Sequence, residues 1–495
     1  MSYLGAIDQG TTSTRFMIFD QTGTVISAAQ IEHTQFLPQA GWVEHDPLEI
    51  LRATDHVIKK ALADAGLKGS DLAAIGITNQ RETTVAWSAM TGVPLHNAIV
   101  WQDTRSQSIL DAINHDMSEK IRFKTGLPLA PYFSASKMGW MLANSETVKS
   151  ALDQQELRFG TIDSWLVWHL SEENLHVTDV SNASRTLLMN LETLDWDSEL
   201  LQAFGIPRES LGEIRSSSEI YGYTKVDGVF GARIPIAGIV GDQHAALLGQ
   251  LCFEKGESKT TYGTGNFALI NTGTEIIRSK KGLLTTLAFK LGAEPAKYAL
   301  EGSVAVTGSA VQWLRDQLGI IEKSSDIEGL AASVPTSGGV YFVPAFSGLF
   351  APYWRGDARG VIVGLTRAAT KAHIARATLE AICYQTHDVI RAMEEETGVL
   401  IKVLRVDGGI TQNQLCMQIQ ANVLQTEVSR PVVAETTALG AAYAAGLAVG
   451  VWKNKEELLT QWQESNHWHP LVTALEASDG LAQWNKAIER TLNWI

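Results

Sequence analysis

The stretch Ile7-Asp8-Gln9-Gly10-Thr11-Thr12-Ser13-Thr14-Arg15 lies between two short apolar runs near the start of the chain. The runs, at 3–7 and 16–19, have the length and composition of β-strands, so the stretch is predicted to be the turn of a hairpin. Residues 24–26 add a third strand to form a meander. Gly10 leaves room for a ligand to approach the backbone, because glycine has no side chain.

The polar groups of this turn suit a phosphate and a metal ion. The hydroxyl groups of Thr11, Thr12 and Ser13, with the backbone N–H groups beside them, are donors for phosphate oxygens. Asp8 can hold a divalent metal, directly or through water, and Arg15 adds a fork of donors. A lone turn of this composition is also typical of a polar surface hairpin, so its interpretation depends on the rest of the chain.

A helix and a fourth strand follow the hairpin. Asp46, Pro47 and Glu49 form a helix start, and Gly66 ends the predicted helix. Residues 73–77 are then typical of a compact buried strand. Three strands, a helix and a fourth strand indicate an α/β fold that is not a simple doubly wound one.

The composition excludes several classes of protein. The chain has 495 residues, 45% hydrophobic and 19% charged, which favours a globular protein of two domains, or three at most. Its net charge of −14 argues against nucleic acid and anionic membranes as partners. No apolar run approaches membrane-spanning length, and we expect no leader peptide. Three widely separated cysteines favour the reducing cytoplasm.

Polar residues follow the fourth strand, where an open α/β sheet usually binds its ligand. Arg81 and Glu82 offer donors and acceptors for the hydroxyl groups of a small polar substrate. Trp101 can pack against the carbon skeleton of that substrate, although core packing explains a lone tryptophan equally well. Tyr132, in a loop that leads into a helix, can add a phenolic hydroxyl.

One carboxylate stands at the tip of a later strand. The apolar run 234–240 ends in Gly241 and delivers Asp242. A general base that accepts or orients the proton of a substrate hydroxyl during phosphoryl transfer belongs at such a place. The alternative is a helix N-cap, because a helical run begins at Gln243. We give the neighbouring His244 no catalytic role.

The second half of the chain repeats the opening pattern. Residues 258–262 and 267–271 are strand candidates on either side of the turn Gly263-Thr264-Gly265-Asn266. Two similar α/β halves that face each other would place both Gly/Thr turns on one nucleotide, one on each side of its phosphates. The strand at 403–406, followed by Asp407-Gly408-Gly409 and a helix start, is typical of a nucleotide-docking turn.

The sequence lacks other well-known catalytic motifs. It contains no Walker-type P-loop, no His-Glu-x-x-His, no Gly-x-Ser-x-Gly and no cysteine metal cluster. Near the C-terminus, His467 and His469 are two residues apart, and we expect both to be exposed without a chemical role.

Seven motifs resemble the FGGY carbohydrate kinases, a family within the actin-like ATPase superfamily. They run in the family's order across nearly the whole chain: Asp8-Gln9-Gly10-Thr11-Thr12-Ser13, Asn79-Gln80-Arg81-Glu82-Thr83, Trp101-Gln102-Asp103-Thr104-Arg105, Gly241-Asp242-Gln243, Tyr262-Gly263-Thr264-Gly265, Asp407-Gly408-Gly409 and Glu435-Thr436-Thr437-Ala438-Leu439-Gly440-Ala441-Ala442. The second and third motifs are similar to those of the members that phosphorylate glycerol.

The resemblance implies an α/β fold of two ribonuclease-H-like domains, 1–250 and 251–495, that close on ATP and Mg²⁺. It implies transfer of the γ-phosphoryl group of ATP to a terminal hydroxyl of glycerol, which gives sn-glycerol 3-phosphate and ADP. It also implies a cytoplasmic homo-oligomer, a dimer or a tetramer, whose partners are glycerol and ATP rather than nucleic acid or a membrane.

The same resemblance assigns a role to each site residue. The glycerol hydroxyls would be bound by Arg81, Glu82, Tyr132, Asp242 and Gln243, with Asp242 as base. Trp101 and Phe267 would flank the glycerol carbons. The phosphates would be held by Thr11, Thr12, Ser13, Arg15 and Thr264. The nucleoside end would be held by Gly308, Gln312, Gly409 and Asn413. Asp8 would bind Mg²⁺ through water.

Two other functions stay open at this point. One is a kinase of the same family that acts on a different polyol or ketose, for which Arg81, Glu82 and Trp101 are the discriminating residues. The other is a non-catalytic, ATP-binding switch on the actin-like fold. A switch needs no alcohol site, so the strand-delivered Asp242 argues against it.

Overall fold

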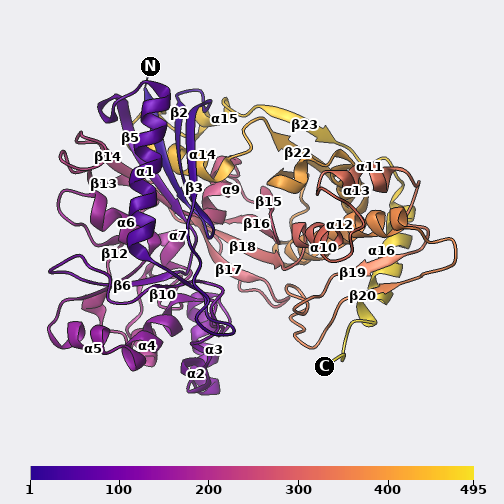
Figure 1. Cartoon of the computed structure of the whole chain (residues 1–495), viewed down its shortest axis with the longest axis horizontal. Coiled ribbons are helices and arrows are strands. Elements are labelled where there is room, and N and C mark those ends of the chain that lie inside the picture. Colours follow the sequence, from indigo (N-terminus) through magenta and orange to yellow (C-terminus); the bar gives the residue numbers. More distant parts are fainter. Residues whose placement is uncertain (1) are drawn as a thin grey trace.

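Two large β-sheets, one in each half of the chain, organise the computed structural model, which describes residues 2–495 (Figure 1). The first half holds a six-stranded sheet of order β13-β14-β5-β1-β2-β3. Its strands are β1 Tyr3–Gln9, β2 Ser13–Asp20, β3 Val25–Glu32, β5 Leu72–Asn79, β13 Ser218–Tyr223 and β14 Pro235–Gly241.

The opening hairpin has the predicted form. Strands β1 and β2 are antiparallel with Asp8 opposite Arg15, and β3 pairs antiparallel with β2. Helix α1 (Pro47–Ala65) begins where Asp46 accepts a hydrogen bond from the backbone N–H of Leu48, and it ends at Gly66 in the left-handed conformation. Strand β5 then joins β1 in parallel, which confirms the α/β unit.

The second half repeats this topology. Its seven-stranded sheet has the order β17-β18-β16-β15-β21-β22-β23. The antiparallel pairs β15/β16 and β16/β18 and the parallel pairs β15/β21 and β21/β22 match β1/β2, β2/β3, β1/β5 and β5/β14. The strands are β15 Ser258–Tyr262, β16 Asn266–Gly273, β17 Leu284–Phe289, β18 Lys297–Val304, β21 Val403–Asp407, β22 Glu427–Pro431 and β23 Glu464–Trp468. The predicted internal repeat is therefore present in the strand order.

Smaller sheets and helices complete the two halves. The four-stranded sheet of order β4-β7-β6-β8 comprises Glu44–His45, Ala98–Ile99, Thr84–Ser88 and Leu157–Thr161. Three further strand pairs are β9/β12 (Val177–Asp179, Glu213–Arg215), β10/β11 (Met189–Asn190, Asp195–Trp196) and β19/β20 (Tyr341–Val343, Val361–Val363). The remaining α-helices are α2 Gln107–Asp111, α3 His115–Thr125, α4 Ser134–Asn144, α5 Glu146–Asp153, α6 Ile162–Leu170, α7 Val180–Ala183, α8 Ser198–Phe204, α9 Asp242–Gly249, α10 Gly308–Asp316, α11 Asp326–Ala332, α12 Lys371–Thr397, α13 Gln414–Leu424, α14 Thr436–Ala448, α15 Lys455–Leu459 and α16 Ala474–Glu489.

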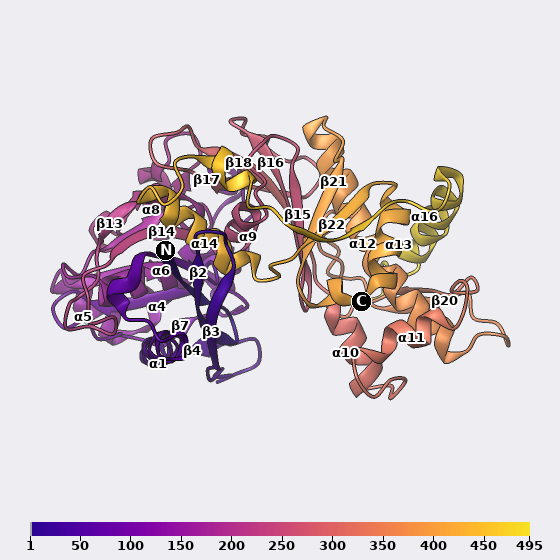
Figure 2. The ribbon, with the colours of Figure 1, turned by 90° about the horizontal axis from the view of Figure 1, so that it is seen from above.

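Helix α14 belongs to the second half of the sequence but lies against the sheet of the first half (Figure 2). A Cβ atom at Gly76 of β5 would come within 2.1 Å of the carbonyl oxygen of Ala441, so only glycine allows this close approach. A Cβ atom at Gly440 would likewise come within 1.9 Å of the carbonyl oxygen of Ala245 in α9. The small residues of α14 therefore let it pack directly on β5 and α9.

Within residues 2–495, no helix combines the length and the apolar character that a membrane crossing requires. All three cysteines are free and buried. The fold brings Cys383 and Cys416 together, with 3.9 Å between their sulfur atoms, although 32 residues separate them in sequence.

Candidate active site

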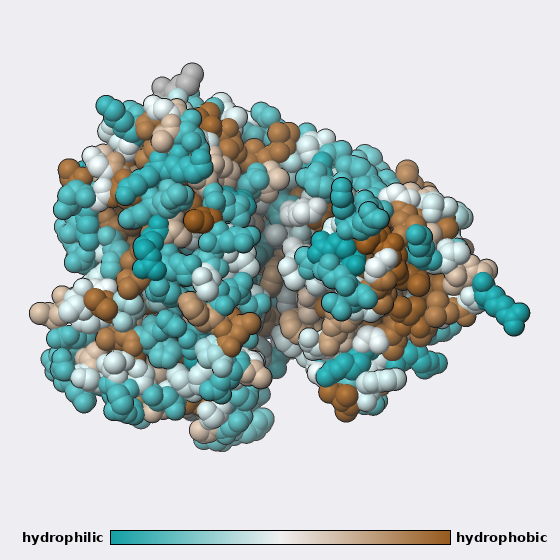
Figure 3. All heavy atoms as spheres, in the orientation of Figure 1, coloured by the Kyte–Doolittle hydropathy of each residue, from teal (hydrophilic) through white to brown (hydrophobic). Residues whose placement is uncertain are grey.

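A groove separates the two halves of the molecule (Figure 3), and side chains from both halves meet across their interface. Arg81 and Glu82 follow the end of β5 after one residue, Gln80, and Asp242 directly follows β14. Because β5 and β14 are parallel neighbours, their carboxyl ends lie at the same edge of the sheet. The second half contributes Glu301 from the middle of β18.

Arg81 is the centre of the site, and carboxylates of both halves hold its guanidinium group. Its Nη1 and Nη2 atoms donate to the two carboxylate oxygens of Glu301, at 2.6 and 3.1 Å. Its Nε atom lies 2.9 Å from Oδ1 of Asp242. The side chains of Arg81 and Glu301 are 2% and 1% exposed, so this bidentate pair is fully desolvated and geometrically fixed.

Asp242 has the environment of a proton acceptor. The backbone N–H of Gln243 and the Arg81 guanidinium both contact Oδ1, which leaves Oδ2 without a partner in the described part of the chain. The side chain is 30% exposed, so a substrate can reach it. Burial raises the pKa of the Asp242 carboxyl group, and the Arg81 charge opposes the rise. The N-cap alternative is wrong, because Gly241 is the cap residue of α9 and Asp242 is its first helical residue.

Glu82 lies in a strained backbone conformation. Its φ angle is 62°, which is uncommon for a residue with a side chain. The hydroxyl groups of Thr84 and Ser134 hold this conformation by donating to the Glu82 carbonyl oxygen, each at 3.0 Å. Its carboxylate accepts a hydrogen bond of 2.7 Å from Nε of Arg185. Strain of this kind is typical of functional sites, and here it aims a buried carboxylate at the Arg81 cluster.

The structure adds three charged residues to the site, namely Arg185, Lys259 and Glu301. Arg185 bridges Glu82 and Glu301, at 2.7 and 3.3 Å. The buried Nζ of Lys259 donates to Oε1 of Gln243 at 2.5 Å, and burial lowers the pKa of Lys259 to about 8. Lys259 in β15 and Glu301 in β18 lie within otherwise buried strands. A buried charge requires a partner, so these two residues could have been recognised as site candidates from the sequence.

Aromatic residues connect the Arg81 cluster to the opening hairpin turn. The indole N–H of Trp101 donates to Oγ1 of Thr11 at 2.9 Å. The Trp101 and Tyr132 rings meet edge to face with 5.3 Å between centroids. Trp101 is half-buried and bonded to the turn, so it is not a simple core residue. Buried Lys137 fixes the Tyr132 loop, because its Nζ donates to three carbonyl oxygens of residues 131–133.

The hairpin turn is fixed by hydrogen bonds and leaves hydroxyl groups accessible. Gln30 on β3 accepts from the Arg15 guanidinium and donates to Oγ of Ser13 at 2.8 Å. The N–H of Gly10 donates to the carbonyl oxygen of Ser13 at 2.9 Å, which closes the turn. Thr12 is exposed at the tip. The turn can therefore receive an anion with little rearrangement.

Asp8, at the end of β1, has the character of a metal-binding carboxylate. Burial raises its pKa from 3.8 to about 6, and the charges of Asp242 and Glu435 add to this rise while Arg15 opposes it. A divalent cation would stabilise a partly desolvated carboxylate that lies near two others, because its positive charge would offset their mutual repulsion. The residues present thus fit a hydrated Mg²⁺ ion.

The Gly/Thr turn of the second half supports the start of α10. Backbone N–H groups of Thr307 and Ser309 donate to the carbonyl oxygen of Thr264, at 3.0 and 3.1 Å. A Cβ atom at Gly308 would come within 2.5 Å of the carbonyl oxygen of Gly263. The side chain of Thr264 is exposed, as is that of Gln312 one turn further along α10.

The turn after β21 is the third element on this side. A Cβ atom at Gly408 would come within 2.3 Å of the carbonyl oxygen of Tyr262, which places this turn beside β15. At Gly409 no atom lies within 4 Å of the Cβ position, so the protein's own packing does not require glycine there. The Asn413 side-chain oxygen caps α13 by accepting from the N–H of Cys416 at 2.8 Å, which leaves its NH₂ group for a ligand. Phe267, on β16, is half-buried.

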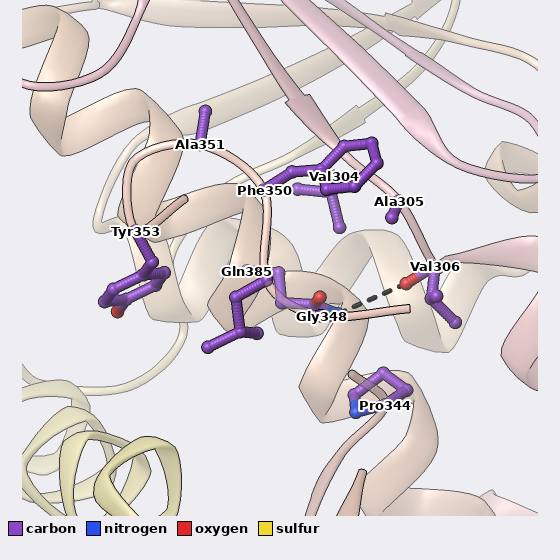
Figure 4. Close-up of a pocket in the computed structure, with 10 residues that line it drawn as sticks. Val304, Ala305, Val306, Pro344, Gly348, Phe350, Ala351, Tyr353 and Gln385 are labelled. Atoms are coloured by element: carbon purple, nitrogen blue, oxygen red, sulfur yellow. Dashed lines mark hydrogen bonds between the residues drawn. The ribbon is translucent and has the colours of Figure 1, made fainter. Parts of the chain in front are cut away.

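A separate pocket lies in the second half, between the end of β18, the segment 344–353 and α12 (Figure 4). Nε2 of Gln385 donates to the carbonyl oxygen of Val306 at 3.2 Å across its wall. The pocket lacks charged side chains and is lined by Val304, Ala305, Val306, Pro344, Gly348, Leu349, Phe350, Ala351, Tyr353 and Gln385. It therefore offers neither a base nor a phosphate ligand, and the Arg81 cluster remains the candidate active site.

Comparison with known proteins covers the full length of the chain. Residues 3–249 match the N-terminal domain, and residues 259–449 the C-terminal domain, of the FGGY family of carbohydrate kinases. The chain is 59% identical to glycerol kinase 1 of Streptomyces coelicolor over 100% of its own length and 98% of the relative. It is 58% identical to a glycerol kinase of Mycobacterium tuberculosis, over 100% and 96% of the two lengths.

Solved structures agree with these matches. The structure of Plasmodium falciparum glycerol kinase with ADP superposes with a TM-score of 0.92 at 38% identity and covers 99% of this chain and 98% of that one. Gluconate kinase from Lactobacillus acidophilus, at 24% identity and a TM-score of 0.86 over 99% and 97% of the chains, has the same fold. The predicted α/β architecture of two sheet-rich domains is thus confirmed, and the chain belongs to the FGGY family of carbohydrate kinases.

Proposed function

We propose that this chain is an enzyme that transfers the γ-phosphoryl group of ATP to glycerol and forms sn-glycerol 3-phosphate and ADP. The observation that carries the proposal is the partly exposed Asp242, whose Oδ1 is held by Arg81 while its Oδ2 has no partner among residues 2–495. The glycerol kinases of S. coelicolor and M. tuberculosis, at 58–59% identity over the full chain, support glycerol as the substrate.

The residues around Asp242 suit a three-carbon triol. Glycerol has little apolar surface, so recognition depends on hydrogen bonds, which we assign to Arg81, Glu82, Tyr132 and Gln243. Trp101 and Phe267 would flank the carbons. Oδ2 of Asp242 would accept the proton of the terminal hydroxyl as that oxygen attacks the γ-phosphorus.

The two Gly/Thr turns would hold ATP between the halves. We assign the phosphates to Thr11, Thr12, Ser13, Arg15 and Thr264. We assign the nucleoside to Gly308, Gln312, Gly409 and Asn413, for which the open space at Gly409 and the exposed Gln312 give support. Mg²⁺, held by Asp8 through water, would neutralise charge on the phosphates. With these assignments we place the boundary between the two domains, 1–250 and 251–495, near residue 250.

Replacing Asp8 with asparagine is expected to stabilise the ligand-free protein and to abolish Mg²⁺-dependent turnover. The raised pKa means that the folded chain binds this proton more tightly than the unfolded chain, so Asp8 lowers stability as the pH rises from about 4 to about 6. Removing the charge should therefore raise the free energy of unfolding by about 1–3 kcal/mol at pH 7.

Urea unfolding of both proteins at pH 7 and pH 5 measures this effect, and the difference should be smaller at pH 5, where Asp8 is largely protonated in the folded state. An Asp8→Asn variant that is less stable at pH 7 would contradict the proposed electrostatics. An unaltered rate with Mg²⁺-ATP would contradict the metal role.

The substrate is tested by ATP-dependent phosphorylation of glycerol, dihydroxyacetone, a pentulose and a hexulose. We expect fast turnover with glycerol and little with the ketoses. Turnover with a ketose alone would instead support a kinase of another polyol or ketose and would overturn the roles of Arg81, Glu82 and Trp101. ATP binding without turnover of any alcohol would support the non-catalytic switch.

We also propose a cellular location and an oligomeric state. A cytoplasmic location is supported by three buried, free cysteines, and cell fractionation would check it. A homo-oligomer stays a prediction of the family resemblance, which light scattering of the purified protein would test.

A further inference from the structure

The edge strand β23 and the residue that follows it place two histidines beside one carboxylate of the neighbouring strand. His467 and His469 are two residues apart, so their side chains lie on the same face of the strand. Glu427, at the start of β22, faces both: Nε2 of His467 lies 3.2 Å from Oε2, and Nδ1 of His469 lies 3.3 Å from Oε1. The expectation that both histidines are exposed is confirmed, and both also face the Glu427 carboxylate.

We propose that Glu427, His467 and His469 bind a divalent transition-metal ion of the Zn²⁺ class. One nitrogen of each imidazole and one carboxylate oxygen lie within 4.8 Å of one another. Ligand atoms about 2.0–2.2 Å from a tetrahedral Zn²⁺ ion are roughly 3.3–3.6 Å apart. The three ligand atoms here lie within 4.8 Å of one another, so side-chain rotation that brings them closer by up to about 1 Å would complete the site. The exposed side of His469 leaves the fourth position to water.

The carboxylate of Glu464 orients the His467 ring for this role. Nδ1 of His467 lies 2.5 Å from Oε1 of Glu464, and Oγ of Ser429 donates to the same oxygen at 2.6 Å. A carboxylate on one imidazole nitrogen fixes the proton there and turns the other nitrogen, as a lone pair, toward the metal. Here that other nitrogen is Nε2, which already faces Glu427.

Ion pairing of protonated histidines with Glu427 is the competing explanation. The two imidazole rings stack with 4.5 Å between centroids, so two positive rings would repel each other. A single divalent ion satisfies both nitrogens and the carboxylate at once. Imidazole ligands favour Zn²⁺, Ni²⁺ or Cu²⁺ over Mg²⁺, which separates this site from the carboxylate site at Asp8. The ion would add a cross-link between the end of β23 and the start of β22, and so strengthen the pairing of this edge strand.

Titration calorimetry of the tag-free, full-length protein with ZnCl₂ tests the proposal. We expect one site per chain, and at least tenfold weaker binding in the variant His467→Gln/His469→Gln. The variant His56→Gln/His115→Gln removes two exposed histidines elsewhere and should bind Zn²⁺ like the parent. Glu464→Gln keeps all three ligands and should weaken binding about tenfold. MgCl₂ should give no heat at this site.

Thermal unfolding gives a second, independent measurement. Zn²⁺ should raise the Tm of the parent and of the His56/His115 control, but not that of the His467/His469 variant. The rate with Mg²⁺-ATP and glycerol should be equal in all of them. Absence of a one-to-one Zn²⁺ site in the parent, or equal affinity in the His467/His469 variant, would overturn the proposal.

Discussion

An Asp242→Asn variant should phosphorylate glycerol about 10³-fold more slowly than the parent, because general base catalysis contributes about 10²–10⁴-fold to such reactions. Asparagine keeps an oxygen for Arg81 and for the N–H of Gln243, but it cannot accept the substrate proton. The loss should appear in kcat, with little change in KM for ATP. Steady-state kinetics at saturating glycerol and ATP measure it.

The matched control is Asp46→Asn, which makes the same chemical change at the start of another helix. Asparagine caps a helix as well as aspartate does, so this variant should retain parental turnover. A similar rate loss in both variants would indicate helix destabilisation rather than chemistry. Parental kcat in Asp242→Asn would remove Asp242 from the role of base.

A Glu301→Gln variant should be less stable and should bind glycerol more weakly. The change leaves Arg81 and Arg185 buried with one carboxylate fewer between them. Removing one partner of a buried ion pair typically costs about 3–5 kcal/mol. Without the bidentate contact, Arg81 is also free to turn away from the substrate, so KM for glycerol should rise more than kcat falls.

Urea unfolding and steady-state kinetics of this variant measure the two effects. Glu172→Gln is the control, because it breaks a surface pair with Arg233 whose side chains are 32% and 54% exposed. Exposed ion pairs contribute little to stability, so this variant should resemble the parent in both assays. Equal stability and equal KM in Glu301→Gln would show that the contact between the halves does not position Arg81.

Local signals in the sequence were sufficient for most of the fold. The hairpin around Gly10, the helix from Asp46 to Gly66 and the small-residue helix α14 each follow from neighbouring residues: alternating apolar runs, caps, and small side chains. Arg81 and Asp242 were found for a topological reason, since each lies within two residues of the end of one of two neighbouring parallel strands.

The remaining site residues depend on contacts between distant segments. Glu301 lies 220 residues from Arg81, and their meeting depends on how the two halves pack. The left-handed backbone of Glu82 is held by Ser134, 52 residues away. The pairing of Glu427 with His467 depends on the register of β22 against β23, which a one-residue shift would break. No local sequence pattern predicts these long-range contacts.

The packing of α14 on β5 means that the two halves are not independent folding units. A fragment cut near residue 250 would lack the helix that covers one face of its own sheet, and buried residues such as Leu4, Ala74 and Val240 would face water. The ribosome would have to complete almost the whole chain before the first half closes its core. Truncated versions of this protein should therefore aggregate during expression rather than yield a working half.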